Sequence, residues 1–294
     1  MNSIGILLTD HQSINESIIL KSVNKIKNSR LKLIFFIGDK KKFPKLFNKV
    51  SKLKKCQFIH IENRPKSFDY LNKILNYALR LFKSNKIKYV INMPIDKKKF
   101  LINKYPGFTE MFSQKIDNKK NENMLLFSQN FSVCPVTTHI PLNEVNVKIN
   151  YKIVNQALKN IDNFYKKKLK KKIKLSILGM NPHASKDFAK KNKDNQILKK
   201  IVKNFKKKKI DIEGPLSADT AFKNYKNKVY IGMYHDQVLI PFKLINKFNG
   251  INITIGKKYI RLSPDHGTGV DIFKKNKKIN TLSFRKCIEF CEKY

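Results

Sequence analysis

Short apolar segments of the kind that form buried strands alternate along this chain with longer segments whose apolar residues recur at helical spacing. The strand-like segments include "SIGILLT", "LKLIFFIG", "IKYVINMP" and "IKLSILGM". One helix-spaced stretch carries five apolar residues on a single face: Leu71, Ile74, Leu75, Ala78 and Leu81. This alternation is typical of an α/β protein with a largely parallel sheet. The 294 residues suffice for one large or two medium domains, and no linker rich in Gly, Ser or Pro separates two halves.

The charge of the chain raises the question of nucleic-acid binding. Lys and Arg number 63 against 21 Asp and Glu, a formal net charge of +42, which attracts phosphates in a salt-dependent way. Only five of the 63 are arginines, however, and arginine is the residue that makes bidentate base contacts. The lysines are spread through the whole chain together with Asn and Ile, so we attribute them to an AT-rich genome and expect no specific nucleic-acid partner. A non-enzymatic, basic nucleic-acid-binding protein remains an alternative. The positive electrostatic field of the chain would also favour the binding of an acidic or phosphorylated small substrate.

The sequence offers no sign of export or membrane insertion. No apolar run approaches the roughly 20 residues that span a bilayer, and "MNSIGILLTD" lacks the basic and small-residue features of a signal peptide. The four cysteines form no CxxC pair. We expect a cytoplasmic protein with no membrane partner.

Four of the six histidines follow strand-like segments, where α/β folds place their ligand-binding loops. These four are His139, His183, His235 and His266. Imidazoles that converge from several strands suit a divalent metal, and three of them with one open position mark a catalytic ion. The separations between His139, His183 and His235 match no short metal motif, so spacing alone does not establish the site.

Two carboxylates stand near these segments. Asp236 follows His235 directly, and Asp219 lies in "GPLSADTAF". Each could orient an imidazole by a hydrogen bond, or serve only as turn and helix-capping chemistry.

Glycine spacing limits how a dinucleotide could bind. The only GxG is Gly267-Thr268-Gly269, and no third glycine follows at the required position. A standard Rossmann fingerprint or P-loop is therefore excluded.

Seven stretches in order along the chain resemble the 4-hydroxythreonine-4-phosphate dehydrogenase family of pyridoxal phosphate biosynthesis, of which this sequence would be a divergent member. They are "PGFTE", "TTHIPL", "GMNPHA", "GPLSADTAF", "MYHDQVLIPFK", "NITIG" and "IRLSPDHGTGVDI". The resemblance implies a fold like that of isocitrate and isopropylmalate dehydrogenases, with two α/β subdomains and an active-site cleft between them. The first would comprise residues 1–115 and 270–294, and the second residues 116–269. It also implies a homodimer with active sites at the interface.

The resemblance assigns roles residue by residue. The expected metal ligands are His139, His183 and His235. The expected substrate-binding residues are Thr109, Lys243, Asn252 and Arg261. The expected cofactor loop is Asp265, His266, Gly267 and Thr268. Lys243 together with Asp219 and Asp236 forms the expected catalytic group.

The implied reaction is the oxidation of 4-phosphooxy-L-threonine at C3 to a β-keto acid, which decarboxylates to 3-amino-2-oxopropyl phosphate in vitamin B6 (pyridoxine 5′-phosphate) biosynthesis. NAD or NADP would accept the hydride. Zinc is the first choice for the divalent metal, with magnesium, cobalt or manganese as alternatives.

Two departures from the family pattern stand out. Phe108 occupies the position of the histidine in the family's "PGHTE", and "TDHQSINES" has lost the glycines of "GDPAGIGPE". Drift in an AT-rich genome explains both. Alternatively, the protein is a related dehydrogenase of another phosphorylated hydroxy acid, such as a four-carbon sugar acid phosphate.

Overall fold

The computed structural model describes residues 1–63, 66–117, 119–188, 191–275 and 278–294, which form two compact units. Unit 1 comprises Met1–Lys120, Phe248–Ile253 and Lys257–Tyr294, and unit 2 comprises Asn121–Lys247 and Thr254–Gly256. The division expected from sequence differs, since it assigned residues 257–269 to the second subdomain. These residues belong to unit 1 because strand β11 (Ile260–Pro264) pairs in parallel with β4 (Tyr89–Asn92).

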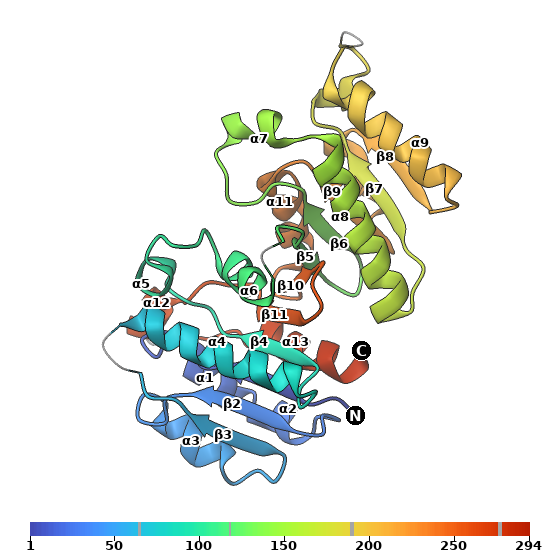
Figure 1. The fold of residues 1–294 in the computed structure, drawn as a ribbon. Helices are drawn as coiled ribbons and strands as arrows, with labels where there is room; N and C mark the ends of the chain where they lie inside the picture. The colour runs from blue at the N-terminus through green and yellow to red at the C-terminus, as the bar shows by residue number, and fades with distance from the viewer. Residues whose placement is uncertain (64–65, 118, 189–190, 276–277) are drawn as a thin grey trace. The chain divides into compact units, whose positions relative to one another are not determined.

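Unit 1 is built on parallel strands in the order β3-β2-β1-β4-β11 (Figure 1). The strands not yet located are β1 (Ile4–Leu7), β2 (Ile34–Gly38) and β3 (Cys56–His60). β10 (Ile251–Ile255) follows β11 in the sheet and contributes residues to both units. Both β1 and β4 are buried at every position, as expected for central strands of a sheet covered on two faces. The predicted α/β class with a largely parallel sheet is confirmed.

The helices of unit 1 cover this sheet. They are α1 (Asn15–Lys21), α2 (Val23–Lys27), α3 (Pro44–Val50), α4 (Ser67–Lys83), α5 (Lys97–Leu101), α6 (Phe108–Ile116), α12 (Val270–Lys274) and α13 (Leu282–Lys293). α4 packs against β1 and β2 and buries the whole apolar face predicted for it, Leu71 to Leu81. Each fully buried Leu or Ile side chain contributes about 1.5–3 kcal/mol, so this face accounts for much of the core of unit 1.

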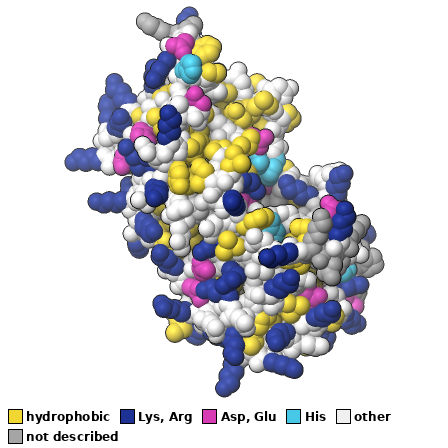
Figure 2. Space-filling model, turned by 180° about the vertical axis from the view of Figure 1, so that it is seen from behind, with side chains coloured by type: hydrophobic (Ala, Val, Ile, Leu, Met, Phe, Trp, Pro, Cys, Tyr) yellow, Lys and Arg dark blue, Asp and Glu magenta, His cyan; other side chains and the backbone are white. Residues whose placement is uncertain are grey.

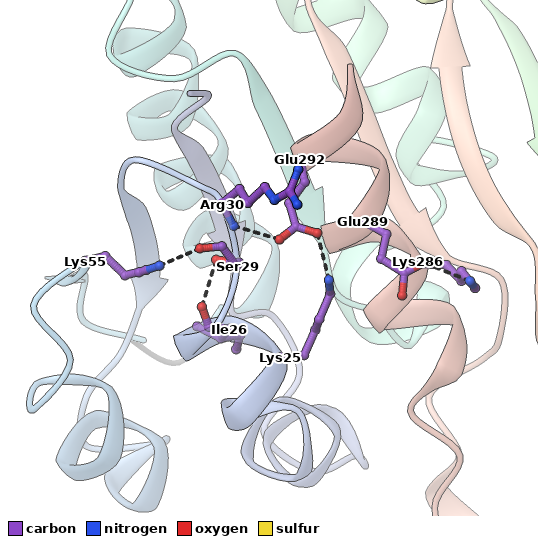
Figure 3. Close-up of polar contacts among 8 residues, drawn as sticks. All are labelled: Lys25, Ile26, Ser29, Arg30, Lys55, Lys286, Glu289 and Glu292. Carbon is purple, nitrogen blue, oxygen red and sulfur yellow. Dashed lines mark hydrogen bonds and ion pairs between the residues drawn. The ribbon is translucent and has the colours of Figure 1, made fainter.

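One acidic side chain connects α13 to α2 and to the loop after it. The Glu292 carboxylate accepts hydrogen bonds from Lys25 Nζ at 2.7 Å and from the Arg30 backbone N–H at 2.8 Å (Figure 3). The neighbouring pair of Lys286 and Glu289 lies within α13 itself, at 2.8 Å. Glu292 therefore joins elements that are far apart in sequence, whereas Glu289 does not.

The strands of unit 2 follow the order β5-β6-β9-β7-β8 beyond β10. They are β5 (Asn123–Phe127), β6 (Ser132–Pro135), β7 (Lys174–Leu178), β8 (Ile212–Leu216) and β9 (Lys228–Gly232). β5 and β6 form an antiparallel pair, and the other three pairings are parallel. The α-helices are α7 (Leu142–Lys148), α8 (Tyr151–Asn163), α9 (Lys199–Lys207), α10 (Ala218–Ala221) and α11 (His235–Asn246). Short helices of other types are η1 (Phe164–Leu169), η2 (Pro182–Ser185), η3 (Asp194–Leu198) and η4 (Phe222–Asn224).

The surface is lysine-rich throughout. Figure 2 shows Lys and Arg side chains scattered over the whole face drawn, as the even spread of lysines along the sequence predicts. Among the described residues, no helix has the length and apolar character needed to cross a bilayer.

Candidate functional site

His139 and His235 lie side by side at the ends of two paired strands of unit 2. β6 and β9 are in register with Pro135 opposite Gly232, and Thr137 continues the pairing by donating both its N–H and its hydroxyl to the carbonyl of Met233. His139 follows two residues later, and His235 begins α11. The two imidazole centroids are 5.8 Å apart. Strand pairing thus brings together two histidines that are 96 residues apart in sequence.

His183 lies in a strained turn after β7. His183, Ala184 and Ser185 all have positive φ, 50°, 52° and 59°, a conformation that costs non-glycine residues energy and recurs at functional sites. The buried carboxylate of Asp194 stabilises the turn by accepting from the N–H groups of Met180 and Asn181 and from the hydroxyl of Ser185. The His183 ring itself remains 62% exposed.

A carboxylate contacts Nδ1 of two of these histidines. Asp236 Oδ1 is 2.6 Å from Nδ1 of His235, and Asp187 Oδ2 is 2.6 Å from Nδ1 of His183. Such a contact fixes the tautomer and directs the Nε2 lone pair outward, the arrangement usual for metal-binding histidines. Asp236 thus contacts a histidine as the sequence suggested. Asp219 is exposed on α10, and the carboxylate on His183 is Asp187, which sequence reasoning missed.

The donor chemistry of these residues fits a divalent metal, although the structure gathers only part of the expected ligand set. His139 and His235 are neighbours, and carboxylates orient His235 and His183. In the described ranges, however, no group of three or more His, Cys, Asp or Glu side chains is placed to hold an ion. His183 is therefore not brought into one cluster with the other two.

The end of β7 and the start of α11 are also connected. Gln237 accepts from the backbone N–H of Met233 at 2.7 Å and donates to the carbonyl of Gly179 at 2.7 Å. Lys243, exposed on the same helix, follows His235 by eight residues, about 12 Å along the axis. The predicted residues of α11 therefore occupy one helix whose first turn is fixed to two strand ends.

Arg261 is a buried cation in unit 1, 4% exposed on β11. Its Nε donates to Asn92 at the end of β4, and its Nη1 donates to the hydroxyl of Thr109 at 3.2 Å. Its guanidinium carbon lies 5.1 Å from the ring centroid of Phe108. Burial lowers the pKa of Arg261 to about 10, while nearby Glu110 opposes that shift. Two predicted substrate-binding residues, Thr109 and Arg261, are thus in direct contact.

Asn252 lies on β10, the neighbour of β11. Its side-chain Oδ1 is buried and has no hydrogen-bond partner among the described residues. An unsatisfied buried carbonyl costs about 1–3 kcal/mol, and a bound donor would remove that penalty. This is the behaviour expected of a ligand-binding residue.

The glycine-containing loop from Asp265 to Gly269 borders a pocket of about 600 Å³ in unit 1. Asp265 N–H donates to Ser283 at 2.8 Å, and Thr268 accepts from the backbone of Ile14 at 3.2 Å, which fixes both ends of the loop. Gly269 has φ +60°, and a Cβ there would lie 2.6 Å from Ile14. The residues lining the pocket include Ile14, Phe248, His266, Gly267, Lys278 and Arg285. Of these, sequence reasoning identified only the loop residues.

The altered N-terminal segment remains ordered by side-chain bonds. Asn15, fully buried, donates to the carbonyls of Asp10 and Pro94, and Thr9 donates to the carbonyls of Met93 and Pro94. Polar side chains therefore hold this loop, although it lacks the family's glycines.

The model of the family described as pyridoxal phosphate biosynthetic protein PdxA matches residues 6–291. The chain is 33% identical to a 4-hydroxythreonine-4-phosphate dehydrogenase of Sulfurihydrogenibium sp. (strain YO3AOP1), over 94% of this chain and 93% of that one. It is 31% identical to a D-threonate 4-phosphate dehydrogenase of Pectobacterium atrosepticum, over 57% and 52%.

Solved structures share the fold. A 4-hydroxythreonine-4-phosphate dehydrogenase from Klebsiella pneumoniae superposes with a TM-score of 0.79 at 22% identity, covering 99% of this chain and 98% of that one. One from Burkholderia phymatum gives 0.77 at 23% identity, covering 100% and 98%.

Proposed function

The chain belongs to the PdxA family, and on that premise we propose that it is an NAD(P)- and metal-dependent dehydrogenase of 4-hydroxythreonine 4-phosphate in vitamin B6 biosynthesis. The observation that carries the proposal is the buried Arg261 in contact with Thr109. A guanidinium can bind a phosphate or a carboxylate through two parallel hydrogen bonds, and the proposed substrate carries both groups.

Substrate binding is assigned to four side chains. Arg261 offers a planar fork of donors that can grip either anionic group by two hydrogen bonds. Asn252 has a buried oxygen ready to accept from a substrate amine or hydroxyl, and Thr109 adds a hydroxyl beside Arg261. The family motif assigns substrate binding to Lys243 as well, an exposed cation on α11.

His139, His235 and His183 are the residues that would hold the metal. When bound, the nicotinamide cofactor supplies a hydride acceptor and the ion supplies Lewis acidity. Asp236 and Asp187 keep Nδ1 of their histidines protonated, so that Nε2 carries the free lone pair. Asp219 has no observed contact with a histidine, so we leave it without a role in orienting one.

The cofactor is assigned to the pocket beside Asp265, His266, Gly267 and Thr268. Its volume of about 600 Å³ falls in the range of small-molecule sites. The apolar walls of Ile14 and Phe248 suit a heteroaromatic base. A nicotinamide dinucleotide thereby finds a site although the chain lacks a Rossmann fingerprint.

The test is NADH or NADPH formation by purified, zinc-loaded protein given 4-hydroxythreonine 4-phosphate. Turnover that a chelator stops and zinc restores is the expected result. Folded, metal-loaded protein that gives no turnover with either cofactor would overturn the proposal.

A second candidate substrate is D-threonate 4-phosphate, which carries a hydroxyl where the first substrate carries an amine. The observation in its favour is Phe108, an apolar, 6% exposed ring beside Arg261 where the family motif has a histidine. Steady-state kinetics with both compounds decide the question, since the physiological substrate has the higher kcat/KM.

We also propose that the enzyme is a homodimer. Unit 2 exposes large apolar side chains on two helices: Leu142 and Val147 on α7, and Ile240 and Leu244 on α11, 57% to 79% exposed. A second copy that covers them would remove this apolar surface from water. Sedimentation should give twice the mass of 34.5 kDa, and Leu244→Glu should shift the protein towards monomer.

A further inference from the structure

Met233 joins two of the strand ends that lead to the histidines. Its backbone carbonyl accepts from the N–H of Thr137 at 3.2 Å and from the Thr137 hydroxyl at 2.7 Å. Its backbone N–H donates to the side-chain oxygen of Gln237 at 2.7 Å. His139 lies two residues after Thr137, and His235 lies two residues after Met233. The N–H and the carbonyl of Met233 are therefore both bonded to residues that stand close to an expected metal ligand.

Gln237 extends this connection to a third strand. Its Nε2 donates to the carbonyl of Gly179, directly after β7, at 2.7 Å. His183 follows Gly179 by four residues. A Cβ on Gly179 would lie 2.7 Å from Cα of Ala184, so the turn that carries His183 packs closely on this strand end. Gln237 thus binds the backbone beside β7 as well as beside β9, and the bonds of Met233 continue the connection to β6.

The two ends of the Gln237 amide have separable roles. Gln237 is the third residue of α11, a position from which Glu or Gln commonly reaches back to a backbone N–H at the helix start. The bond from Met233 to Oε1 is of this kind, and a carboxylate would accept it as well. The bond from Nε2 to Gly179 reaches a separate strand and needs a donor, which a carboxylate lacks. A glutamine, and not a glutamate, is therefore needed to join β7 to α11.

We propose that Gln237 is a positioning residue for the metal: by fixing the end of β7 to the start of α11, it holds the His183 loop where its imidazole can share one ion with His139 and His235. The inference rests on the proposed function in taking the three histidines as the ligands. An ion whose ligands come from separate loops is bound tightly only where the surrounding hydrogen bonds hold those loops in place. Gln237 has this role without binding the metal or the substrate.

The test is a double-mutant cycle on zinc affinity, measured by competition with a chelating dye on the purified full-length protein. The four proteins are the unsubstituted chain, His183→Ala, Gln237→Glu and the double variant. Gln237→Glu keeps the acceptor for Met233 and removes the donor to Gly179. The cycle compares the loss caused by His183→Ala in the two backgrounds, so a uniform effect of the added carboxylate on the ion cancels.

The expected result is a coupling between the two positions. The factor by which His183→Ala weakens zinc binding should be at least about fivefold larger in the unsubstituted background than in Gln237→Glu, which lies within the range found for coupled residues. Gln156→Glu is the matched control, because half-buried Gln156 donates to Asn160 at 2.9 Å within the single helix α8. It adds the same charge and removes the same kind of bond, and it should leave the effect of His183→Ala unchanged.

An equal loss from His183→Ala in all three backgrounds would overturn the inference and leave Gln237 as a helix-capping residue. Gln237→Met, uncharged and similar in length, repeats the cycle if urea unfolding shows that Gln237→Glu does not fold. A merely structural role would lower the free energy of unfolding without changing the effect of His183→Ala on zinc binding.

The remaining outcome separates this inference from the proposed function. If His183→Ala leaves zinc affinity unchanged in the unsubstituted background, His183 is not a ligand and the inference fails. Zinc-dependent turnover of 4-hydroxythreonine 4-phosphate would then still support the dehydrogenase assignment, and its absence would overturn that assignment separately.

Discussion

The guanidinium of Arg261 faces the ring of Phe108, with 5.1 Å between its central carbon and the ring centroid. The two residues belong to β11 and to the first turn of α6, and both are buried. The ring occupies the position where the family motif has a histidine, so an aromatic face rather than an imidazole lies against the cation in this chain.

The contact with Phe108 should influence substrate affinity. A desolvated cation–π contact contributes about 0.5–2 kcal/mol, equivalent to about 2- to 30-fold in binding. Phe108→Leu should raise KM and the substrate dissociation constant by that factor and leave kcat nearly unchanged. Phe112→Leu, in the same helix and also buried, is the control. Equal KM values in the two variants would show that Phe108 only fills the core.

Metal retention should depend on the carboxylates that contact histidines. Asp236→Asn and Asp187→Asn each remove a charged hydrogen bond to Nδ1, which typically weakens metal binding 10- to 100-fold. Asp219→Asn, on the exposed surface of α10, should leave the affinity unchanged. Competition with a chelating dye measures all three. A loss in Asp219→Asn as large as in Asp236→Asn would contradict the assignment of the orienting residues.

Acid should weaken unit 2 through Glu213, which connects three strands. Burial by itself raises the pKa of Glu213, but hydrogen bonds from Ser176, Lys228 and Lys174 outweigh it and hold the pKa below its ordinary value of 4.5. Ser176 Oγ and Lys228 Nζ lie 2.7 and 2.9 Å from the carboxylate. Because the folded-state pKa is lowered, this stabilisation is present above pH 4.5 and is lost as the pH falls through the folded-state value.

Glu213→Gln should therefore cost about 1–2 kcal/mol at neutral pH, and the difference from the unsubstituted protein should shrink as the pH falls below 4.5. Urea unfolding at a series of pH values measures it. Glu144→Gln, exposed on α7, is the control and should show no such loss. A difference that grows on acidification would contradict the sign of this argument.

Glu292 should stabilise unit 1 more than Glu289, the other acid of α13. Glu292→Gln weakens its bonds to Lys25 and to the Arg30 backbone, and we expect a loss of about 1–2 kcal/mol. Glu289→Gln removes only the pair within the helix, worth about 0.3–0.5 kcal/mol. Thermal unfolding of the two variants compares them directly, and equal midpoints would show that Glu292 adds nothing specific.

Local patterns predicted the α/β class and the apolar face of α4. The spacing of apolar residues within one helix or strand predicts which of its side chains are buried, because that spacing decides which side chains share a face. The contact of Thr109 with Arg261 depends on the order of the strands in the sheet, which the spacing of apolar residues within one element cannot reveal. The family motifs nevertheless pointed to both residues. Asp187 was missed for a different reason, since a short turn with three positive φ angles has no sequence signature when none of its residues is glycine.

The pocket residues Lys278 and Arg285 were missed because lysine-rich sequence hides them. Among 63 basic residues, these two carry no signal until the fold places them beside a cavity. The departures at Phe108 and in residues 9–17 were visible in the sequence, but only the structure shows how Arg261 and Asn15 accommodate them.

Unit 1 is assembled from three chain segments, whereas Asn121–Lys247 supplies nearly all of unit 2 in one stretch. During synthesis on the ribosome, unit 2 has almost its whole sequence before β11 and α13 emerge. β4 meanwhile has β1 beside it but lacks its other parallel neighbour β11, and α13 is not yet present to pack on β11. Unit 2 can therefore complete its fold before unit 1, although unit 1 begins earlier in the sequence.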